Sequence, residues 1–344
     1  MSVEISRESA IEFCRTMLLI RHFEEALIKL HNEERFRGHY HVYIGQEATG
    51  VPALSLLRAN DYVFTTHRNH GHVLARGADP GRMLAEILGR RDGYNKGKGG
   101  SFHVAPAELG FLQTSAVVAG ILPLATGAAY GAKEKQSGQV SVCSFGDGAL
   151  EEGAAAESFN LASIWKLPVL YLCENNGKYG HGKATGAMRS STMSVFPLTD
   201  LPGAYKIPAR QVDGTDVDAV LDVIGDALKK IRAGEGPQFI EAQTVRWPGS
   251  VSNWPVLPVA TEVSLAWDLS PVPAAVSDWY QFSDPLLIFI RKLVADGRAS
   301  KDQIVQLEKG VKEKIAEAIE FAFASPEPDL KSALEGVFAS QSGN

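Results

Sequence analysis

Two short polar motifs in the middle of the chain carry oxygen atoms suited to binding a metal ion. Gly146-Asp147-Gly148 follows one short apolar run, and Asn175-Asn176 follows the next. A helix-compatible stretch rich in Ala and Glu, residues 149–165, joins the two runs. Parallel strands connected by a helix end at the same edge of a sheet, so we expect Asp147 and Asn176 to lie close together.

The chemistry expected of this pair is magnesium-assisted binding of a diphosphate. Magnesium takes oxygen ligands, usually one or two from side chains and the rest from phosphates and water. The free N–H groups at the start of the helix expected after Gly148 also favour an anion. Either motif alone could be an ordinary turn or polar loop. The order strand, GDG, helix, strand, NN favours the metal-diphosphate site.

Two other phosphate motifs are excluded. The GDG turn begins like a dinucleotide-binding motif, but Glu151 occupies the position of the third glycine. Asp147 would also repel a pyrophosphate without a metal. The segment 177–183 is one residue short of a Walker motif, and Ala184 stands where Ser or Thr is needed.

The elements around these motifs predict an α/β fold, a mostly parallel sheet with helices on both faces and a helical C-terminal tail. We expect residues 1–284 to form one α/β domain and residues 285–344 its helical extension. Residues 247–285 contain six prolines and no clear period. Expected element boundaries are a helix capped at Ser9 and ending near Arg35, a helix after Gly45, a helix from Asp79-Pro80 to Gly89, a helix from Thr215 to Arg232, a strand at 239–245, and helices starting at Asp284-Pro285 and Ser300.

Composition places the chain among ordinary globular proteins. Of 344 residues, 45% are hydrophobic and 22% charged, and the net charge is −6. Neither a nucleic-acid partner nor a membrane span is expected, because there is no Lys/Arg run and no stretch of ~20 apolar residues. The polar start and three scattered cysteines indicate a cytoplasmic protein.

Several motifs together resemble the alpha subunit of the thiamine-diphosphate-dependent 2-oxo acid dehydrogenases, the decarboxylating component of the pyruvate, branched-chain and acetoin complexes. The likeness covers most of the chain. GDG with NN is common to thiamine-diphosphate enzymes, whereas the GQEA and GKGGS segments are specific to this family. The motifs are Gly38–Glu47, Thr66–Gly71, Lys96–His103, GDG with NN, and Asp284-Pro285 with the helical tail.

The resemblance implies thiamine diphosphate and Mg²⁺ as cofactors and assigns roles by position. Asp147 and Asn176 match the magnesium ligands, with the carbonyl of Lys178 as a third. His41 matches a catalytic histidine. The remaining cofactor-binding positions are Arg68 and Arg246 at the phosphates, Gly146, Gly148 and Ala149 along the diphosphate, and Val118 beneath the bent cofactor.

The resemblance also implies partners. The glutamate that activates the cofactor comes from a separate beta chain, so we expect a beta subunit, an α2β2 assembly, and transfer of the acyl group to a lipoyl acyltransferase. The substrate would be a small 2-oxo acid.

Three departures from the family leave the reaction open. Ser250 replaces a loop histidine, His67 replaces an aromatic residue, and Gly177 is one residue extra. A 2-oxo acid dehydrogenase is the leading prediction. A carboligase or split transketolase-like subunit, and a non-catalytic cofactor-binding subunit, are the alternatives.

Overall fold

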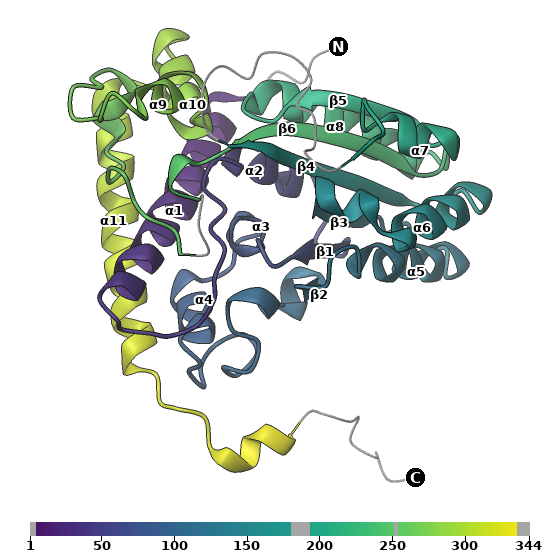
Figure 1. Cartoon of the computed structure of the whole chain (residues 1–344), viewed down its shortest axis with the longest axis horizontal. Helices are drawn as coiled ribbons and strands as arrows, with labels where there is room; N and C mark the ends of the chain where they lie inside the picture. Colours follow the sequence, from purple (N-terminus) through teal and green to yellow (C-terminus); the bar gives the residue numbers. More distant parts are fainter. Residues whose placement is uncertain (1–4, 180–192, 251–253, 336–344) are drawn as a thin grey trace.

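The chain folds around one parallel β-sheet. A computed structural model describes residues 5–179, 193–250 and 254–335. Within these residues six strands pair in the order β2-β1-β3-β4-β6-β5, and every pairing is parallel (Figure 1). The predicted α/β class is therefore confirmed. The strands are β1 Tyr62–Thr66, β2 Phe111–Ser115, β3 Ser141–Gly146, β4 Val169–Tyr179, β5 Ala209–Asp213 and β6 Gln238–Arg246.

Alternate side chains of the strands enter two hydrophobic cores, one on each face of the sheet. In β4, Leu170 and Leu172 join one core, whereas Tyr171 and Cys173 join the other. Because successive side chains of a strand point to opposite faces, both faces must be covered. The first core includes α1 Arg7–Asn32, α2 Glu47–Ser55, α3 His70–Ala75 and α8 Val217–Arg232; the second includes α5 Ile121–Glu134, α6 Gly153–Ile164 and the region of α7 Asp200–Ala204.

The C-terminal helices lie against the first helix. The long α11, Lys301–Ala324, runs beside α1 and α4, Pro80–Ile87, while α10, Pro285–Ala295, contacts both α1 and α2 (Figure 1). A short helix, α9 Ser277–Phe282, precedes α10. No helix in the described part of the chain has the length and apolar character to cross a membrane.

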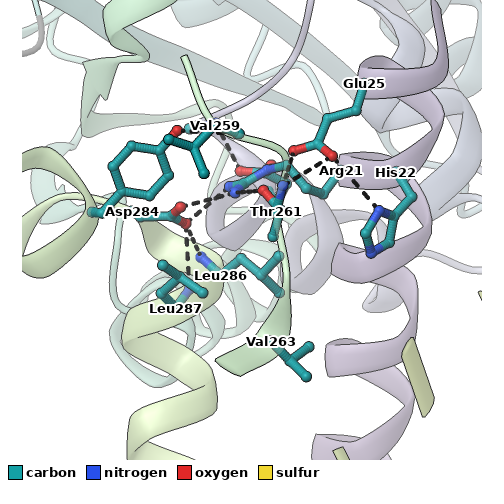
Figure 2. A network of polar contacts seen from close by, with 12 residues as sticks. Arg21, His22, Glu25, Val259, Thr261, Val263, Asp284, Leu286 and Leu287 are labelled. Atoms are coloured by element: carbon teal, nitrogen blue, oxygen red, sulfur yellow. Dashed lines mark hydrogen bonds and ion pairs between the residues drawn. The ribbon is translucent and has the colours of Figure 1, made fainter. Parts of the chain in front are cut away.

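A buried ionic network fixes the segment that leads into α10 (Figure 2). Arg21 of α1 donates to both carboxylate oxygens of Asp284, at 2.8 and 2.9 Å, and to the hydroxyl of Thr261 at 3.2 Å. The carboxylate of Glu25 accepts the backbone N–H of Thr261 at 3.0 Å. The Arg21 and Asp284 side chains are almost fully buried, so burial without this pairing would be costly.

Several predicted boundaries need correction. Ser6, rather than Ser9, caps α1, because its hydroxyl accepts from the N–H of Ser9, and the helix ends at Asn32. Asp216, rather than Thr215, caps α8 through the N–H groups of residues 218 and 219. The predicted caps Asp79, Asp284 and Ser300 are confirmed.

Candidate active site

A cavity of about 290 Å³ opens at the carboxyl edge of the sheet. Thr66, Ser115, Gly146 and Arg246, the last residues of β1, β2, β3 and β6, all line it. Eight residues that the sequence singled out for cofactor or metal binding share this one cavity, although they come from separate parts of the chain. They are Arg68, Val118, Gly146, Asp147, Gly148, Ala149, Asn176 and Arg246.

The two predicted metal ligands come from adjacent strands. Asp147 directly follows β3, and Asn176 lies in β4, which pairs with β3. The β4–β6 register shifts between Asn175 and Lys178, where β4 has one extra residue. Such a bulge re-aims side chains: Asn175 donates to Glu241 at 2.7 Å, whereas Asn176 lines the cavity.

The backbone after β3 differs from the expectation in one respect. A 3₁₀ turn, η3 Asp147–Glu151, follows the strand, and α6 begins only at Gly153. The expected helix start at Ala149 is therefore wrong. The residues that line the cavity, Gly148 and Ala149, belong to this turn rather than to the first turn of α6.

Two arginines converge on the same cavity. Arg68 donates to the carbonyl of Val42, and Arg246 Nε donates to Asn176 Oδ1 at 3.2 Å. Burial, and then the charge of Arg246, lower the pKa of Arg68 to about 10. Two cations held close together in a buried site are the donor set that an anionic phosphate group satisfies. With Asp147 and Asn176 beside them, these residues fit a diphosphate bound through a metal.

A cluster of three rings borders the cavity. His41, the predicted catalytic histidine, is not among the cavity-lining residues but contacts His67, which is: their ring centroids are 4.6 Å apart. Phe102 stacks on the imidazole of His41, with the ring centroids 5.4 Å apart and an interplanar angle of 9°. Burial first, and then Arg68, lower the pKa of His41 to about 3 and that of His67 to about 4. Both imidazoles are therefore neutral near pH 7.

His67 was missed as a functional candidate, because an isolated histidine is more often structural or solvated. The signal available in the sequence was its position directly before Arg68. Glu174 and Gln46 were missed as well, and both line the cavity. Glu174 directly precedes the Asn175-Asn176 motif, and Gln46 lies in the GQEA segment.

The other histidines of this region hold the framework together. His70 Nδ1 lies 2.9 Å from Glu24 Oε2 and its Nε2 lies 2.9 Å from the hydroxyl of Ser101. His72 contacts Thr65 at 2.9 Å and Tyr43 at 3.2 Å. Both imidazoles are buried, so these contacts favour positioning over chemistry.

Two sequence predictions lie at the limits of the described residues. Lys178 pairs with Val245 through its backbone in β4, and the role of its carbonyl as a metal ligand stays a prediction. Ser250 ends the short turn η4, Pro248–Ser250. The side chains of Lys178 and Ser250 lie outside the described part of the chain.

Comparison with known proteins agrees with the motifs. A family model described as dehydrogenase E1 component matches residues 15–253. The pyruvate dehydrogenase E1 component subunit alpha of Rhizobium meliloti is 36% identical over 327 residues, covering 95% of this chain and 89% of the relative. Two further relatives are the acetoin:2,6-dichlorophenolindophenol oxidoreductase subunits alpha of Cupriavidus necator and Bacillus subtilis, which are 33% and 34% identical to this chain. Each alignment covers 98% of this chain, and it covers 97% of the first relative and 96% of the second. The resemblance read from the motifs is therefore confirmed: the chain belongs to the dehydrogenase E1 component family, whose members use thiamine diphosphate, as a chain of the alpha type.

Proposed function

We propose that this chain is the alpha subunit of a thiamine-diphosphate-dependent dehydrogenase that decarboxylates a small 2-oxo acid and passes the acyl group to a lipoyl domain. The observation that carries the proposal is the convergence of Arg68, Arg246, Asp147 and Asn176 on one cavity at the carboxyl edge of the sheet. Positive charge and metal ligands at this edge suit a diphosphate. Membership of the family supplies the reaction class.

The proposed roles follow the positions of the side chains. Asp147 and Asn176 would hold Mg²⁺, with the carbonyl of Lys178 as a further ligand, and Arg68 and Arg246 would pair with the phosphates. Gly146, Gly148 and Ala149 would line the diphosphate, and Val118 would support the rest of the cofactor. When bound, thiamine diphosphate supplies the nucleophilic carbon and the electron sink that decarboxylation requires.

The two neutral imidazoles would serve proton transfer. His67 forms part of the cavity wall, and His41 lies behind it, held between His67 and Phe102. A neutral imidazole accepts a proton and can donate or accept a hydrogen bond, so His67 would contact the reacting group and His41 would orient it. The family position assigns the direct role to His41, and the present geometry adds His67.

The cavity mouth supports the need for a second chain. Val117 and Val118 are 68% and 54% exposed beside the cavity. On the neighbouring helix, Leu124 in the first turn of α5 is also exposed. Apolar side chains grouped around an active site mark a surface that another protein covers. We propose that a beta subunit covers it in an α2β2 assembly that delivers acyl groups to a lipoyl acyltransferase.

The decisive experiment is to copurify the chain from its own source, identify the partner by mass spectrometry, and assay the assembled enzyme. We expect CO₂ release and dye reduction with a 2-oxo acid only when thiamine diphosphate, Mg²⁺ and a beta-type partner are all present. Asp147→Ala should remove more than about 99% of this activity, whereas Asp278→Asn, on the exposed surface of α9, should leave it unchanged. Lack of turnover across several 2-oxo acids would overturn the proposal.

Acetoin cleavage is a second candidate. The two relatives named for acetoin and 2,6-dichlorophenolindophenol are covered over 97% and 96% of their length, against 77–95% for the relatives named as pyruvate dehydrogenase subunits. Breaking the bond between the carbonyl and carbinol carbons of acetoin releases acetaldehyde instead of CO₂. Release of acetaldehyde from acetoin, with no CO₂ from 2-oxo acids, would favour this candidate.

Two further proposals concern the chain as a whole. We propose a cytoplasmic location, which the buried free thiols Cys14, Cys143 and Cys173 support, since a reducing compartment keeps thiols free. We also propose that residues 285–344 extend the domain of residues 1–284, because α10 and α11 pack on α1. Cell fractionation tests the first, and a single cooperative unfolding transition tests the second.

A further inference from the structure

Gln46 carries its side chain into the wall of the cavity, where it contacts Asn176. It is only 4% exposed. Its Oε1 accepts a hydrogen bond from Asn176 Nδ2 at 2.6 Å. Gln46 therefore holds the NH₂ end of the Asn176 amide.

A second contact holds the other end of the Asn176 amide. Arg246 can only donate, and its Nε donates to Asn176 Oδ1 at 3.2 Å. One orientation of the amide satisfies both contacts. In that orientation Asn176 turns its oxygen toward Arg246 and its NH₂ group toward Gln46.

We propose that Gln46 is a positioning residue that keeps the amide oxygen of Asn176, rather than its NH₂ group, directed at the bound metal. The inference rests on the proposed role of Asn176 as a ligand of Mg²⁺. An amide can rotate by half a turn at little cost when nothing distinguishes its two ends. An NH₂ group has no lone pair to offer a cation, so rotation would replace a ligand with a donor.

The turn that presents Gln46 is itself held by buried contacts. Glu47 accepts the N–H of Gly45 at 2.8 Å with one oxygen and Arg21 Nε at 2.8 Å with the other. Gly45 has φ +100°, and a Cβ there would lie 2.9 Å from the carbonyl oxygen of Val245. Only glycine lets this turn lie so close to the end of β6. The last residue of β6 is Arg246, which contacts Asn176.

The test measures metal affinity in the assembled two-chain enzyme with thiamine diphosphate, using Mn²⁺ as a paramagnetic probe of the magnesium site. Gln46→Met keeps the volume of the side chain but removes its donor and acceptor. Loss of an outer-shell partner typically weakens metal binding by about 10–100-fold, and we expect the Kd of Mn²⁺ to rise by that factor. The matched control is Gln139→Met, a half-buried glutamine outside the cavity and just before β3, which should leave the Kd unchanged.

An Asn176→Asp background separates positioning from general structural damage. A carboxylate presents oxygen in both orientations, so nothing remains for Gln46 to select. In that background Gln46→Met should raise the Kd of Mn²⁺ by no more than about threefold. The full 10–100-fold loss in both backgrounds would overturn the proposal.

A second variant covers the case in which Gln46→Met does not fold. Gln46→Glu keeps an oxygen acceptor facing Asn176 Nδ2, so the Kd of Mn²⁺ should stay within about threefold of the parent; a tenfold loss would overturn the proposal. Asn176→Ala separates the proposed metal site from the positioning role of Gln46. Unchanged Mn²⁺ binding in Asn176→Ala would remove the proposed metal site, whereas weakened binding there with unchanged binding in Gln46→Met would remove only the positioning role.

Discussion

At the scale of single residues, the cavity and its border combine two cations with two neutral imidazoles. The charge of Arg246 lowers the pKa of Arg68, and both arginines disfavour a charge on His41 and His67. An anion entering the cavity would relieve this repulsion. The two arginines therefore favour an anionic ligand in the cavity.

Arg246→Lys should weaken Mg²⁺-dependent binding of thiamine diphosphate by at least about tenfold. Lysine keeps the charge but loses the planar fork and the Nε–H that contacts Asn176. Isothermal titration of the assembled enzyme measures the change. Arg58→Lys, an exposed arginine outside the cavity, is the control, and equal affinities for the two variants would argue against a phosphate contact.

The burial of His67 predicts a pH dependence of stability. Its pKa falls to about 4 in the folded chain, against about 6.5 when unfolded. Between these values the unfolded state binds more protons, so the stability present above pH 6.5 is lost as the pH falls toward 4. His67→Phe removes this proton uptake. Between pH 7.5 and pH 5 the melting temperature of the variant should fall less than that of the parent. An equal fall in both proteins would contradict the lowered pKa of His67.

At the scale of elements, one buried carboxylate organises the glycine-rich loop before Phe102. Glu86 of α4 accepts the N–H groups of Asn95, Gly97 and Gly99 at 2.6 to 2.9 Å, and that of Gly100 at 3.3 Å. The loop then continues to Ser101 and Phe102, which contact His70 and His41. A residue remote from the cavity thus sets the loop that flanks the proposed proton-transfer site.

Glu86→Gln should loosen this loop. The new NH₂ group would face N–H donors and leave some of them unsatisfied, which costs about 1–3 kcal/mol. Hydrogen–deuterium exchange should increase over residues 95–103. Glu108→Gln, whose ion pair with Arg82 is exposed, should leave that exchange as it is. Unchanged exchange in Glu86→Gln would mean that the glycines hold the loop by themselves.

Breaking the ionic contact between α1 and α10 should be far more costly than breaking a surface pair. Arg21→Met leaves Asp284 and Glu47 buried without their cation, and such a change costs ~3–5 kcal/mol. Arg15→Met removes only an exposed pair with Glu12, and typical surface pairs contribute ~0–1 kcal/mol. Urea unfolding should give a much lower free energy of unfolding for Arg21→Met than for Arg15→Met. Similar free energies for the two variants would contradict this prediction.

The sequence predicted the elements that carry strong local signals and missed those that depend on packing. The runs ending in GDG and NN and the Asp-Pro helix starts predicted β3, β4, α4 and α10. By contrast β1, β2 and β5 are five-residue strands containing polar side chains, such as Gln113 and Arg210. Their pairing with longer neighbours, rather than their own pattern, makes them strands. The bulge at Asn176 was visible only as one extra residue.

The candidate site was predictable to the extent that its motifs were. Eight predicted residues line one cavity because each lies within three residues of the carboxyl end of a strand. His67, Gln46 and Glu174 escaped because no spacing rule assigns them a role, and only the three-dimensional contacts place them in the wall. The hydrogen bonds that Asn176 makes with Arg246 and Gln46 could not be read from the sequence, since they depend on which atoms meet.

At the scale of the whole molecule, each face of the sheet packs against its own set of helices, and the carboxyl edge carries the cavity. One core joins the sheet to α1, α2 and α8, and α1 carries the C-terminal helices (Figure 1). The other core lies under α5 and α6, whose outer surfaces include exposed apolar side chains. The cavity opens at the carboxyl edge between these two regions. A partner that covers α5 and α6 would therefore also reach the cavity mouth.

The contact between Arg21 and Asp284 joins residues 263 positions apart in the chain. Residues Pro273–Ala275 lie between the two ends of this network and are exposed. A cut there would sever the polypeptide without disturbing the buried charges on either side of it. We expect fragments 1–274 and 275–344, produced together, to reassemble into one particle that elutes at the size of the intact chain. Introducing Arg21→Met into the larger fragment should abolish reassembly. The buried ion pair would then be what holds together two fragments that no longer share a backbone.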